Sequence, residues 1–288
     1  MKLVTFSHQG ATRIGVVAGE EVVDLAAAAP DLPQEMSAFL AAGANALEQA
    51  RSSSGPRLPL ASVKLEAPVL RPPKFLAIGL NYADHVAESG IEKPKHPVFF
   101  NKQSTCVTGP YDPIHSPRAS QALDYEGELA FVIGRRSRHV PKERAHEVIA
   151  GFLVCNDVST RDWQFRAQTM TLGKSFDTHG PLGPWIVTPD EVGDPHSLGL
   201  RTWVNGELRQ ESNTKHLIYD CFDQIETLST VCTLEPGDVI STGTPAGVGM
   251  AMDPRSRLEP GDVVRVEIER IGWIENPVIE EPADTVQI

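Results

Sequence analysis

The sequence has no long apolar run and no excess of basic residues. No apolar stretch approaches the ~18 residues that a membrane-spanning helix requires. The 288 residues include 26 Lys and Arg against 38 Asp and Glu, which gives a formal net charge of −12. Nucleic-acid binding requires a basic face, and an anionic membrane surface attracts basic segments. The acidic balance therefore argues against both kinds of partner.

The sequence also has few cysteines and lacks a C-x-x-C pair. The four cysteines are scattered along the chain, at Cys106, Cys155, Cys221 and Cys232. This distribution argues against a thiolate zinc site and is typical of free thiols in a reducing compartment. The first six residues read as a strand rather than as the apolar part of a signal peptide. We therefore expect a cytoplasmic protein.

The composition of the chain changes near residue 70. Residues 2–25 read as short strands separated by glycines, and the alanine-rich stretch 32–50 reads as one helix. Pro68, Pro72 and Pro73 then mark a seam. We predict a small N-terminal α+β domain over residues 1–70 and a larger domain over residues 71–288.

The larger domain is rich in strand-like segments. Apolar strands are predicted at 75–79, 98–101, 128–133, 151–156, 185–188, 200–204, 238–242 and 263–268. Helical segments are few, at 82–89, 142–150, 160–166 and 218–230. The 23 Gly and 23 Pro residues of the chain provide many turn signals. This pattern favours an α+β roll that is mostly β over a doubly wound sheet.

Two glutamates, Glu126 and Glu128, lie one residue apart in a strand-like run from Leu123 to Gly134. Strand side chains alternate between faces, so both carboxylates are expected on one face. Two carboxylates this close repel each other unless a positive group lies between them. A hard divalent cation with oxygen ligands, Mg²⁺ or Mn²⁺, is the simplest such group. Two solvated carboxylates on an exposed strand are the alternative.

Asp157 follows another apolar strand, at a strand end where a ligand can bind, and is a candidate third carboxylate. A turn or helix-capping aspartate is the alternative. Ser159 or Thr160 could cap the next helix, which would place Arg161 and Gln164 on one face. The planar fork of Arg161 suits a carboxylate or keto-acid group.

His85 and Glu88 lie three residues apart on a predicted short helix that follows the strand ending at Gly79. This spacing places both side chains on one helical face. A carboxylate bonded to one imidazole nitrogen fixes the tautomer and raises the basicity of the other nitrogen. The pair is therefore a candidate general base for water. A surface histidine with an incidental partner is the alternative.

Two further segments could face an anionic ligand. Lys174 follows Gly173 and precedes aromatic sequence, where partial burial would make it a point charge for a developing oxyanion. An exposed lysine is the alternative. A Gly- and Thr-rich loop that includes Thr244 follows the strand at 238–242 and offers N–H groups and hydroxyls to an anion. The glycine spacings of a phosphate loop and of a dinucleotide fingerprint are missing.

Five motifs in this order resemble the fumarylacetoacetate hydrolase family, over most of residues 70–275. They are G-L-N-Y-A-D-H-x-x-E, Y-E-G-E-L, N-D-V-S-x-R-D, G-K-S-F-D and S-T-G-T-P-x-G-V-G. The resemblance is to bacterial members with a small N-terminal domain. It implies a mixed β-roll, usually in a homodimer, around Mg²⁺ or Mn²⁺. At matching positions it implies that Glu126, Glu128 and Asp157 bind the metal.

The resemblance also implies roles for the other candidate residues. The implied roles are water activation by His85 and Glu88, stabilisation of an enolate or oxyanion by Lys174, and binding of a small keto-acid substrate by Arg161, Gln164 and Thr244. The implied reaction is hydrolysis of a C–C bond in an acylpyruvate or diketo acid through a metal-stabilised enolate.

The same residues suit related reactions. Decarboxylation of a 2-oxo-dioate such as oxaloacetate is the first alternative. Isomerisation of a substrate of the 2-hydroxyhepta-2,4-diene-1,7-dioate type is the second. A protein that binds a small acid without turnover is an alternative of another class. The complete set of carboxylates, His85 and Glu88 argues against it, because binding alone does not require a water-activating pair.

Overall fold

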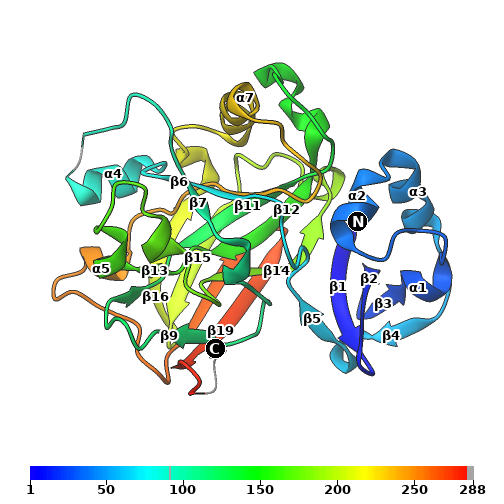
Figure 1. Ribbon diagram of the computed structural model, residues 1–288, viewed down its shortest axis with the longest axis horizontal. Helices are drawn as coiled ribbons and strands as arrows, with labels where there is room; N and C mark the ends of the chain where they lie inside the picture. Colours follow the sequence, from blue (N-terminus) through cyan, green and yellow to red (C-terminus); the bar gives the residue numbers. More distant parts are fainter. Residues whose placement is uncertain (91, 284–288) are drawn as a thin grey trace.

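The structure is a computed structural model that describes residues 1–90 and 92–283. It consists of a small N-terminal part beside a larger body built mainly from strands (Figure 1). The mostly-β α+β class and the small N-terminal domain predicted from the sequence are confirmed. Residue 70, the predicted boundary, lies in the connection between strands β5 (Lys64–Glu66) and β6 (Phe75–Gly79).

The N-terminal part is a small antiparallel sheet covered by three helices. Besides β5, its strands are β1 (Lys2–His8), β2 (Ala11–Ala18), β3 (Glu21–Asp24) and β4 (Arg57–Pro59). Its helices are α1 (Leu25–Ala28), α2 (Met36–Ala41) and α3 (Ala44–Ser52). The single helix predicted over 32–50 is wrong, because Gly43 adopts a φ of +79° and separates α2 from α3.

The large sheet continues from the N-terminal part into the body. Its order is β4-β3-β2-β1-β14-β12-β11-β17-β6-β7, and β1 pairs with β14 across the two parts. β5 pairs with β1, and β8 (Val107–Thr108) pairs with β14. The remaining strands of this sheet are β7 (Val98–Lys102), β11 (Gly127–Ile133), β12 (Ile149–Asn156), β14 (Gly180–Val187) and β17 (Val239–Ser241).

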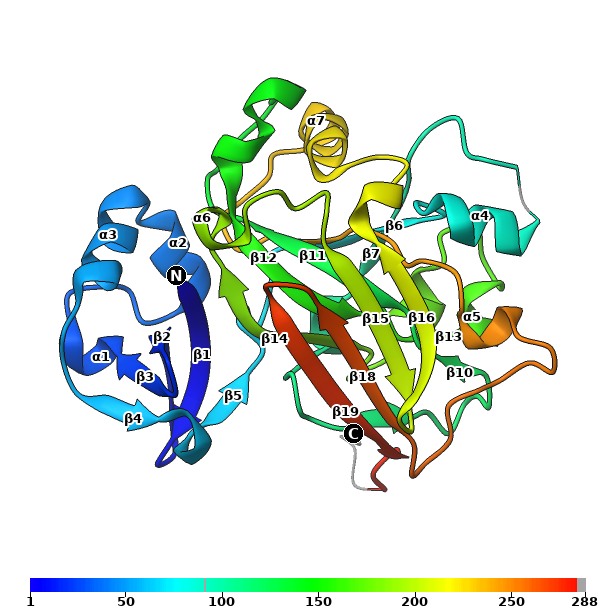
Figure 2. The same ribbon diagram turned by 180° about the vertical axis from the view of Figure 1, so that it is seen from behind.

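A second sheet packs against the body of the first (Figure 2). Its order is β16-β15-β18-β19-β9. These strands are β9 (Ile114–Ser116), β15 (Gly199–Val204), β16 (Glu207–Asn213), β18 (Val263–Ile268) and β19 (Gly272–Glu280). A two-stranded sheet joins β10 (Leu123–Asp124) to β13 (Ser159–Thr160).

The helices of the body are short. They are α4 (Ala83–Ser89), α5 (Arg161–Gln164), α6 (Pro189–Val192) and α7 (Cys221–Val231). 3₁₀ segments occur at Leu60–Ser62, Ser104–Cys106, Lys142–Val148, Thr171–Lys174, Thr214–His216 and Gly249–Ala251.

Three sequence predictions in the body need correction. The strand predicted through 123–134 is interrupted before Gly127, because Leu123–Asp124 pairs with β13 instead of joining the large sheet. The helix predicted over 142–150 is a 3₁₀ segment that ends at Val148, and Ile149 already begins β12. The helix predicted over 160–166 is one turn.

Strand β11 separates two hydrophobic cores. Leu129, Phe131 and Ile133 point into the core shared with the second sheet and α7. Ala130 and Val132 point into the core beneath the N-terminal helices. This alternation follows from the two-residue period of a strand, and each large apolar side chain buried in this way stabilises the fold by roughly 1.5–3 kcal/mol. The middle of β11 is thereby fixed on both faces, which holds its first residues in place.

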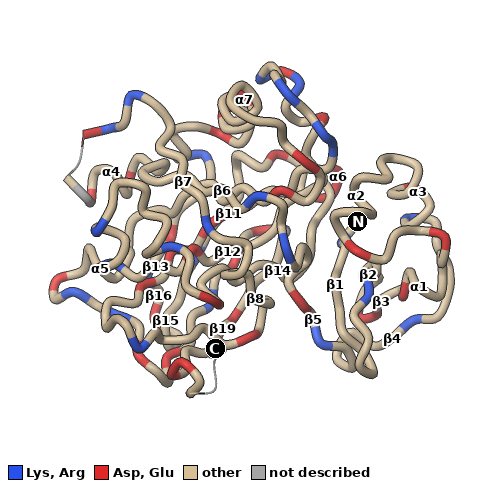
Figure 3. Tube along the Cα trace, viewed as in Figure 1, with Lys and Arg blue, Asp and Glu red and all other residues tan. Residues whose placement is uncertain are grey.

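Charged residues of both signs are interspersed along the two parts of the molecule (Figure 3). No helix among the described residues combines the length and apolar character needed to cross a membrane. The expectation that neither nucleic acid nor membrane is a partner stays a prediction.

We predict that Gly127→Ala destabilises the protein. A Cβ on Gly127 would lie 2.1 Å from Thr202 Oγ1 and 3.0 Å from Val266 Cγ1 of the second sheet. Such overpacking typically costs about 1–3 kcal/mol of unfolding free energy. Urea unfolding followed by circular dichroism measures the loss. Gly199→Ala is the matched control, because its Cβ would have no neighbour closer than 3.6 Å. Equal stability of the two variants would contradict the prediction.

Candidate functional site

Three buried carboxylates converge where β11 begins and β12 ends. Glu126 precedes β11, Glu128 lies within it and Asp157 follows β12. The pairing of Gly127 with Asn156 aligns these positions, and the N–H of Asp157 donates to the carbonyl of Glu126 at 2.9 Å. One oxygen from each carboxylate lies within 4.8 Å of the other two. The structure thus brings together all three residues predicted as metal ligands.

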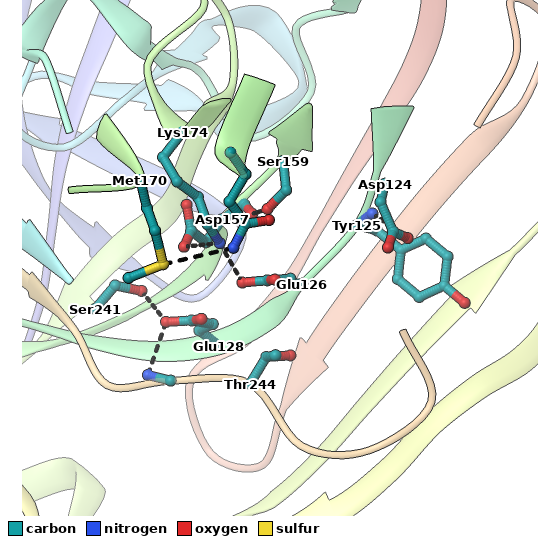
Figure 4. Close-up of polar contacts among 12 residues, drawn as sticks. Asp124, Tyr125, Glu126, Glu128, Asp157, Ser159, Met170, Lys174, Ser241 and Thr244 are labelled. Carbon is teal, nitrogen blue, oxygen red and sulfur yellow. Dashed lines mark hydrogen bonds and ion pairs between the residues drawn. The ribbon is translucent and has the colours of Figure 1, made fainter. Parts of the chain in front are cut away.

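Glu128 is held through one of its two oxygens. Its Oε2 accepts the hydroxyl hydrogen of Ser241 at 2.5 Å and the N–H of Gly243 at 2.8 Å (Figure 4). Burial, with the neighbouring carboxylates of Asp157 and Glu126, raises the pKa of Glu128 well above its ordinary value. The charged form of this carboxyl is therefore disfavoured unless a positive group approaches.

Lys174 and Arg161 neutralise the opposite side of the cluster. The ammonium of Lys174 contacts Glu126 Oε2 at 2.6 Å and Asp157 Oδ2 at 2.7 Å (Figure 4). Arg161 Nη1 donates to Glu126 Oε1 at 2.5 Å, and Arg161 Nε donates to Asp124 Oδ2 at 2.8 Å. Burial disfavours the charged form of Glu126, but Lys174 and Arg161 outweigh it and lower its pKa. Glu126 is therefore ionised.

Lys102 is a residue of this site that the sequence reasoning missed. It ends β7, its side chain is completely buried, and its Nζ donates to Asp157 Oδ1 at 2.6 Å. Burial favours the neutral amine, but the carboxylate of Asp157 outweighs it and raises the pKa of Lys102. The strand period could have indicated that Lys102 is buried, because it lies two residues after the buried Phe100 and therefore on the same face of β7.

The cluster fits a hard divalent cation. Glu126, Glu128 and Asp157 offer only oxygen ligands, as Mg²⁺ and Mn²⁺ prefer. Glu128 is held through Oε2, Glu126 through Oε1 by Arg161, and Asp157 through Oδ1 by Lys102. The other oxygens of Glu126 and Asp157 contact the ammonium of Lys174, so a bound cation would share them with that group. Three protein oxygens leave part of the usual six-oxygen shell of Mg²⁺ to other ligands. Ligation itself stays a prediction.

His85 and Glu88 form the pair predicted from their spacing. On α4, His85 Nδ1 lies 3.3 Å from Glu88 Oε2. Glu88 Oε1 also accepts the N–H of Gly247 at 3.0 Å, so its carboxylate is fixed from two directions. Since Nδ1 of His85 faces Glu88, Nε2 is the nitrogen that remains for proton transfer.

The Gly- and Thr-rich loop after β17 binds carboxylates of the protein through four of its N–H groups. Gly243 binds Glu128, Gly247 binds Glu88, and Gly249 and Met250 bind Asp124. Contact of this loop with an anionic ligand stays a prediction. The loop therefore links the candidate metal ligands to the His85 pair.

The predicted substrate-binding residues lie at the site but already have protein partners. Gln164 accepts a hydrogen bond from Arg161 Nη1 at 3.0 Å. The Thr244 hydroxyl donates to the Gly127 carbonyl at 3.0 Å and accepts from Gln210 at 2.8 Å. Substrate contact by Arg161, Gln164 and Thr244 stays a prediction.

The predicted side-chain cap of α5 is wrong. Thr160 precedes the helix, but its side chain makes no capping hydrogen bond. The hydroxyl of Ser159 donates to the carbonyl of Asp157 at 2.9 Å. Ser159 therefore stabilises the turn that carries the candidate ligand.

A cavity of about 290 Å³ joins these groups. Its polar wall contains His85, Glu126, Glu128, Arg161, Gln164, Lys174 and Thr244. Its other wall is largely apolar, with Ile78, Leu80, Val98, Phe100, Phe165, Met170 and Met250. This volume lies at the lower end of the range of small-molecule sites and suits a small acid.

We predict that the affinity for Mn²⁺ rises with pH, over a pH range that lies above the ordinary pKa of glutamate. Because the pKa of Glu128 is raised, a proton competes with the metal below that pKa and is released when the metal binds. Calorimetry in two buffers with different ionisation enthalpies measures the released proton. Glu128→Gln should bind Mn²⁺ more weakly and lose this pH dependence. A wild-type affinity that stays flat over this range would contradict the prediction.

Two sequence families match this chain. The family described as "Fumarylacetoacetate (FAA) hydrolase C-terminal" matches residues 74–279, and the one described as "Rv2993c-like, N-terminal" matches residues 1–68. The mitochondrial oxaloacetate tautomerase fahd2 of Xenopus laevis is 44% identical over 288 residues, which cover 97% of this chain and 90% of that protein.

Solved structures show the same fold over nearly the whole chain. A fumarylacetoacetate hydrolase from the psychrophile Exiguobacterium antarcticum has a TM-score of 0.86 and 39% identity, covering 98% of this chain and 100% of that one. A maleylpyruvate hydrolase from Sphingobium sp. SYK-6, in complex with manganese (II) and pyruvate, has a TM-score of 0.80 and 33% identity, with the same coverage. With both the sequence and the fold matched along its length, this chain belongs to the fumarylacetoacetate hydrolase family.

Proposed function

We propose that this protein is a divalent-metal-dependent tautomerase of small 2-oxo-dicarboxylic acids, of which oxaloacetate is the type. The observation that carries the proposal is that His85, Glu126 and Glu128 line one small cavity, with Glu88 paired to His85 and Asp157 beside the two glutamates. The near full-length similarity to an oxaloacetate tautomerase supports it. A role in binding without turnover would leave the His85–Glu88 pair without a purpose.

The metal would be Mg²⁺ or Mn²⁺, held by Glu126, Glu128 and Asp157. When bound there, the ion would act as a Lewis acid that polarises the 2-oxo group of the substrate. A manganese ion together with pyruvate in a related hydrolase supports this choice of ion and of ligand class.

Tautomerisation moves one proton between the oxygen on C2 and the carbon C3 of the acid. The enol form loses its O–H proton and gains a proton at C3. The C2–C3 double bond becomes single and the C2–O bond becomes double, so no pair of heavy atoms is joined or separated. His85 Nε2 would carry the proton at C3, and Glu88 would stabilise the imidazolium that forms. The ammonium of Lys174 would compensate negative charge on the C2 oxygen. The apolar wall of the cavity would limit the access of water.

Hydrolysis of a C–C bond in an acylpyruvate is the second candidate. The same His85–Glu88 pair can deprotonate a water molecule, and the fold match to a maleylpyruvate hydrolase favours this reading. Decarboxylation of oxaloacetate would require the same polarised 2-oxo group but no base at C3.

We also propose a cytoplasmic homodimer. The dimer is proposed because the family resemblance implies a homodimer. The location is supported by the four cysteines, which are all free in the structure. Light scattering that gives the mass of a single chain would exclude the dimer.

A substrate panel distinguishes the candidate reactions. With Mg²⁺ or Mn²⁺ present, we expect the protein to accelerate the loss of the enol absorbance of oxaloacetate without release of CO₂. Acylpyruvate should release its acid fragment more slowly. Faster turnover of acylpyruvate would favour the hydrolase, and CO₂ release matching the loss of oxaloacetate would favour a decarboxylase.

We predict that His85→Ala lowers kcat about 10²–10⁴-fold, the usual contribution of a general acid–base group. Its affinity for Mn²⁺ should be unchanged, because His85 is not one of the three converging carboxylates. Glu88→Gln should give a smaller loss, since the imidazole remains. His8→Ala, in the N-terminal part, is the control and should keep wild-type turnover. Unchanged kcat in His85→Ala would exclude the proton-transfer role.

A further inference from the structure

Lys102 is a buried cation whose three donors are all used. An ammonium group carries three N–H donors and no acceptor. The Nζ of Lys102 donates to Asp157 Oδ1 at 2.6 Å, to the His179 carbonyl at 3.0 Å and to the Lys174 carbonyl. Its side chain has no exposed surface. A buried charge is tolerated only where it is paired and hydrogen-bonded, and this site meets both conditions.

These bonds join three separate segments behind the carboxylate cluster. Lys102 lies at the end of β7, Asp157 follows β12, and Lys174 and His179 lie on either side of the turn before β14. No two of these segments are adjacent in the sequence. Lys102 therefore fixes the orientation of the Asp157 side chain and, at the same time, the main chain that carries Lys174.

The two oxygens of Asp157 have different partners. Oδ1 accepts from Lys102 at 2.6 Å, and Oδ2 accepts from the ammonium of Lys174 at 2.7 Å, which also donates to Glu126 Oε2. An acidic side chain next to a metal can bind it through one oxygen or through both. With Oδ1 held by Lys102, Oδ2 is the oxygen of Asp157 that a metal would share with Lys174.

We propose that Lys102 is a positioning residue that holds Asp157 as a single-oxygen metal ligand and fixes the backbone at Lys174. The inference rests on the metal site of the proposed function. It adds to that site a residue at the end of β7 that is not among the residues lining the cavity. Partners that orient a metal ligand in this way typically account for a 10–100-fold difference in metal affinity.

The test is the affinity of the full-length protein for Mn²⁺ alone, measured by calorimetry or by the electron paramagnetic resonance of free Mn²⁺. Lys102→Met keeps the length of the side chain and removes its charge and donors. We expect its affinity for Mn²⁺ to fall about 10–100-fold. A folded Lys102→Met variant with wild-type affinity would overturn the inference.

Lys74→Met is the matched control. Lys74 pairs with the buried Asp238 at 2.7 Å, outside the residues that line the cavity. Its loss should lower the melting temperature and leave the affinity for Mn²⁺ unchanged. If Lys102 only stabilised the fold, its substitution would behave in the same way as that of Lys74.

A double variant keeps the inference testable if Lys102→Met fails to fold. Lys102→Met/Asp157→Asn removes both charges of the pair and leaves no unpaired buried ion. If Lys102 acts through Asp157, this double variant should bind Mn²⁺ as weakly as Asp157→Asn alone. An additional loss of tenfold or more would mean independent effects and would overturn the inference.

The outcomes also separate this inference from the proposed function. No Mn²⁺ binding by the wild-type protein would overturn the metal site and everything that rests on it. Tight binding by the wild type, with equal binding by Lys102→Met, would overturn only the role of Lys102.

Discussion

Mutual repulsion among buried carboxylates is the constraint on which the site depends. Four acidic side chains, Asp124, Glu126, Glu128 and Asp157, are removed from water within one small region. Three buried cations, Lys102, Lys174 and Arg161, lie among them. Four negative charges against three positive ones leave the cluster short of one positive charge, which the raised pKa of Glu128 reflects. A cluster of this kind either holds a proton or binds a cation, and its oxygen-only chemistry suits a hard dication.

The fold supplies this arrangement through strand register and through one loop. Pairing of β11 with β12 places Glu126 beside Asp157, and antiparallel pairing of β17 with β11 brings Ser241, just before the Gly-rich loop, to Glu128. The N–H groups of that loop bind Glu128, Glu88 and Asp124. The candidate metal site and the candidate base are thus held by one segment, so a shift of that loop would disturb both.

Local patterns predicted the residues whose partners are close in sequence. Glu126 and Glu128 share a face because of the two-residue strand period, and His85 meets Glu88 because of helical spacing. Lys102 was missed, because its partner Asp157 lies 55 residues away, and its strand register with the buried Phe100 indicates burial but names no partner. The role of Thr244 was also hidden, since its hydroxyl meets the carbonyl of Gly127, which is 117 residues distant.

The sequence by itself determined the class of the fold, the chemistry of the donors and the separate segments that carry them. These follow from side-chain period, residue type and the order of motifs, all of which are local properties of a chain. Only the tertiary structure decided which donor holds each carboxylate oxygen, and that N–H groups of the loop after β17 bind the protein's own acids. Those choices depend on contacts between segments far apart in the chain, and such contacts exist only after the sheets have paired.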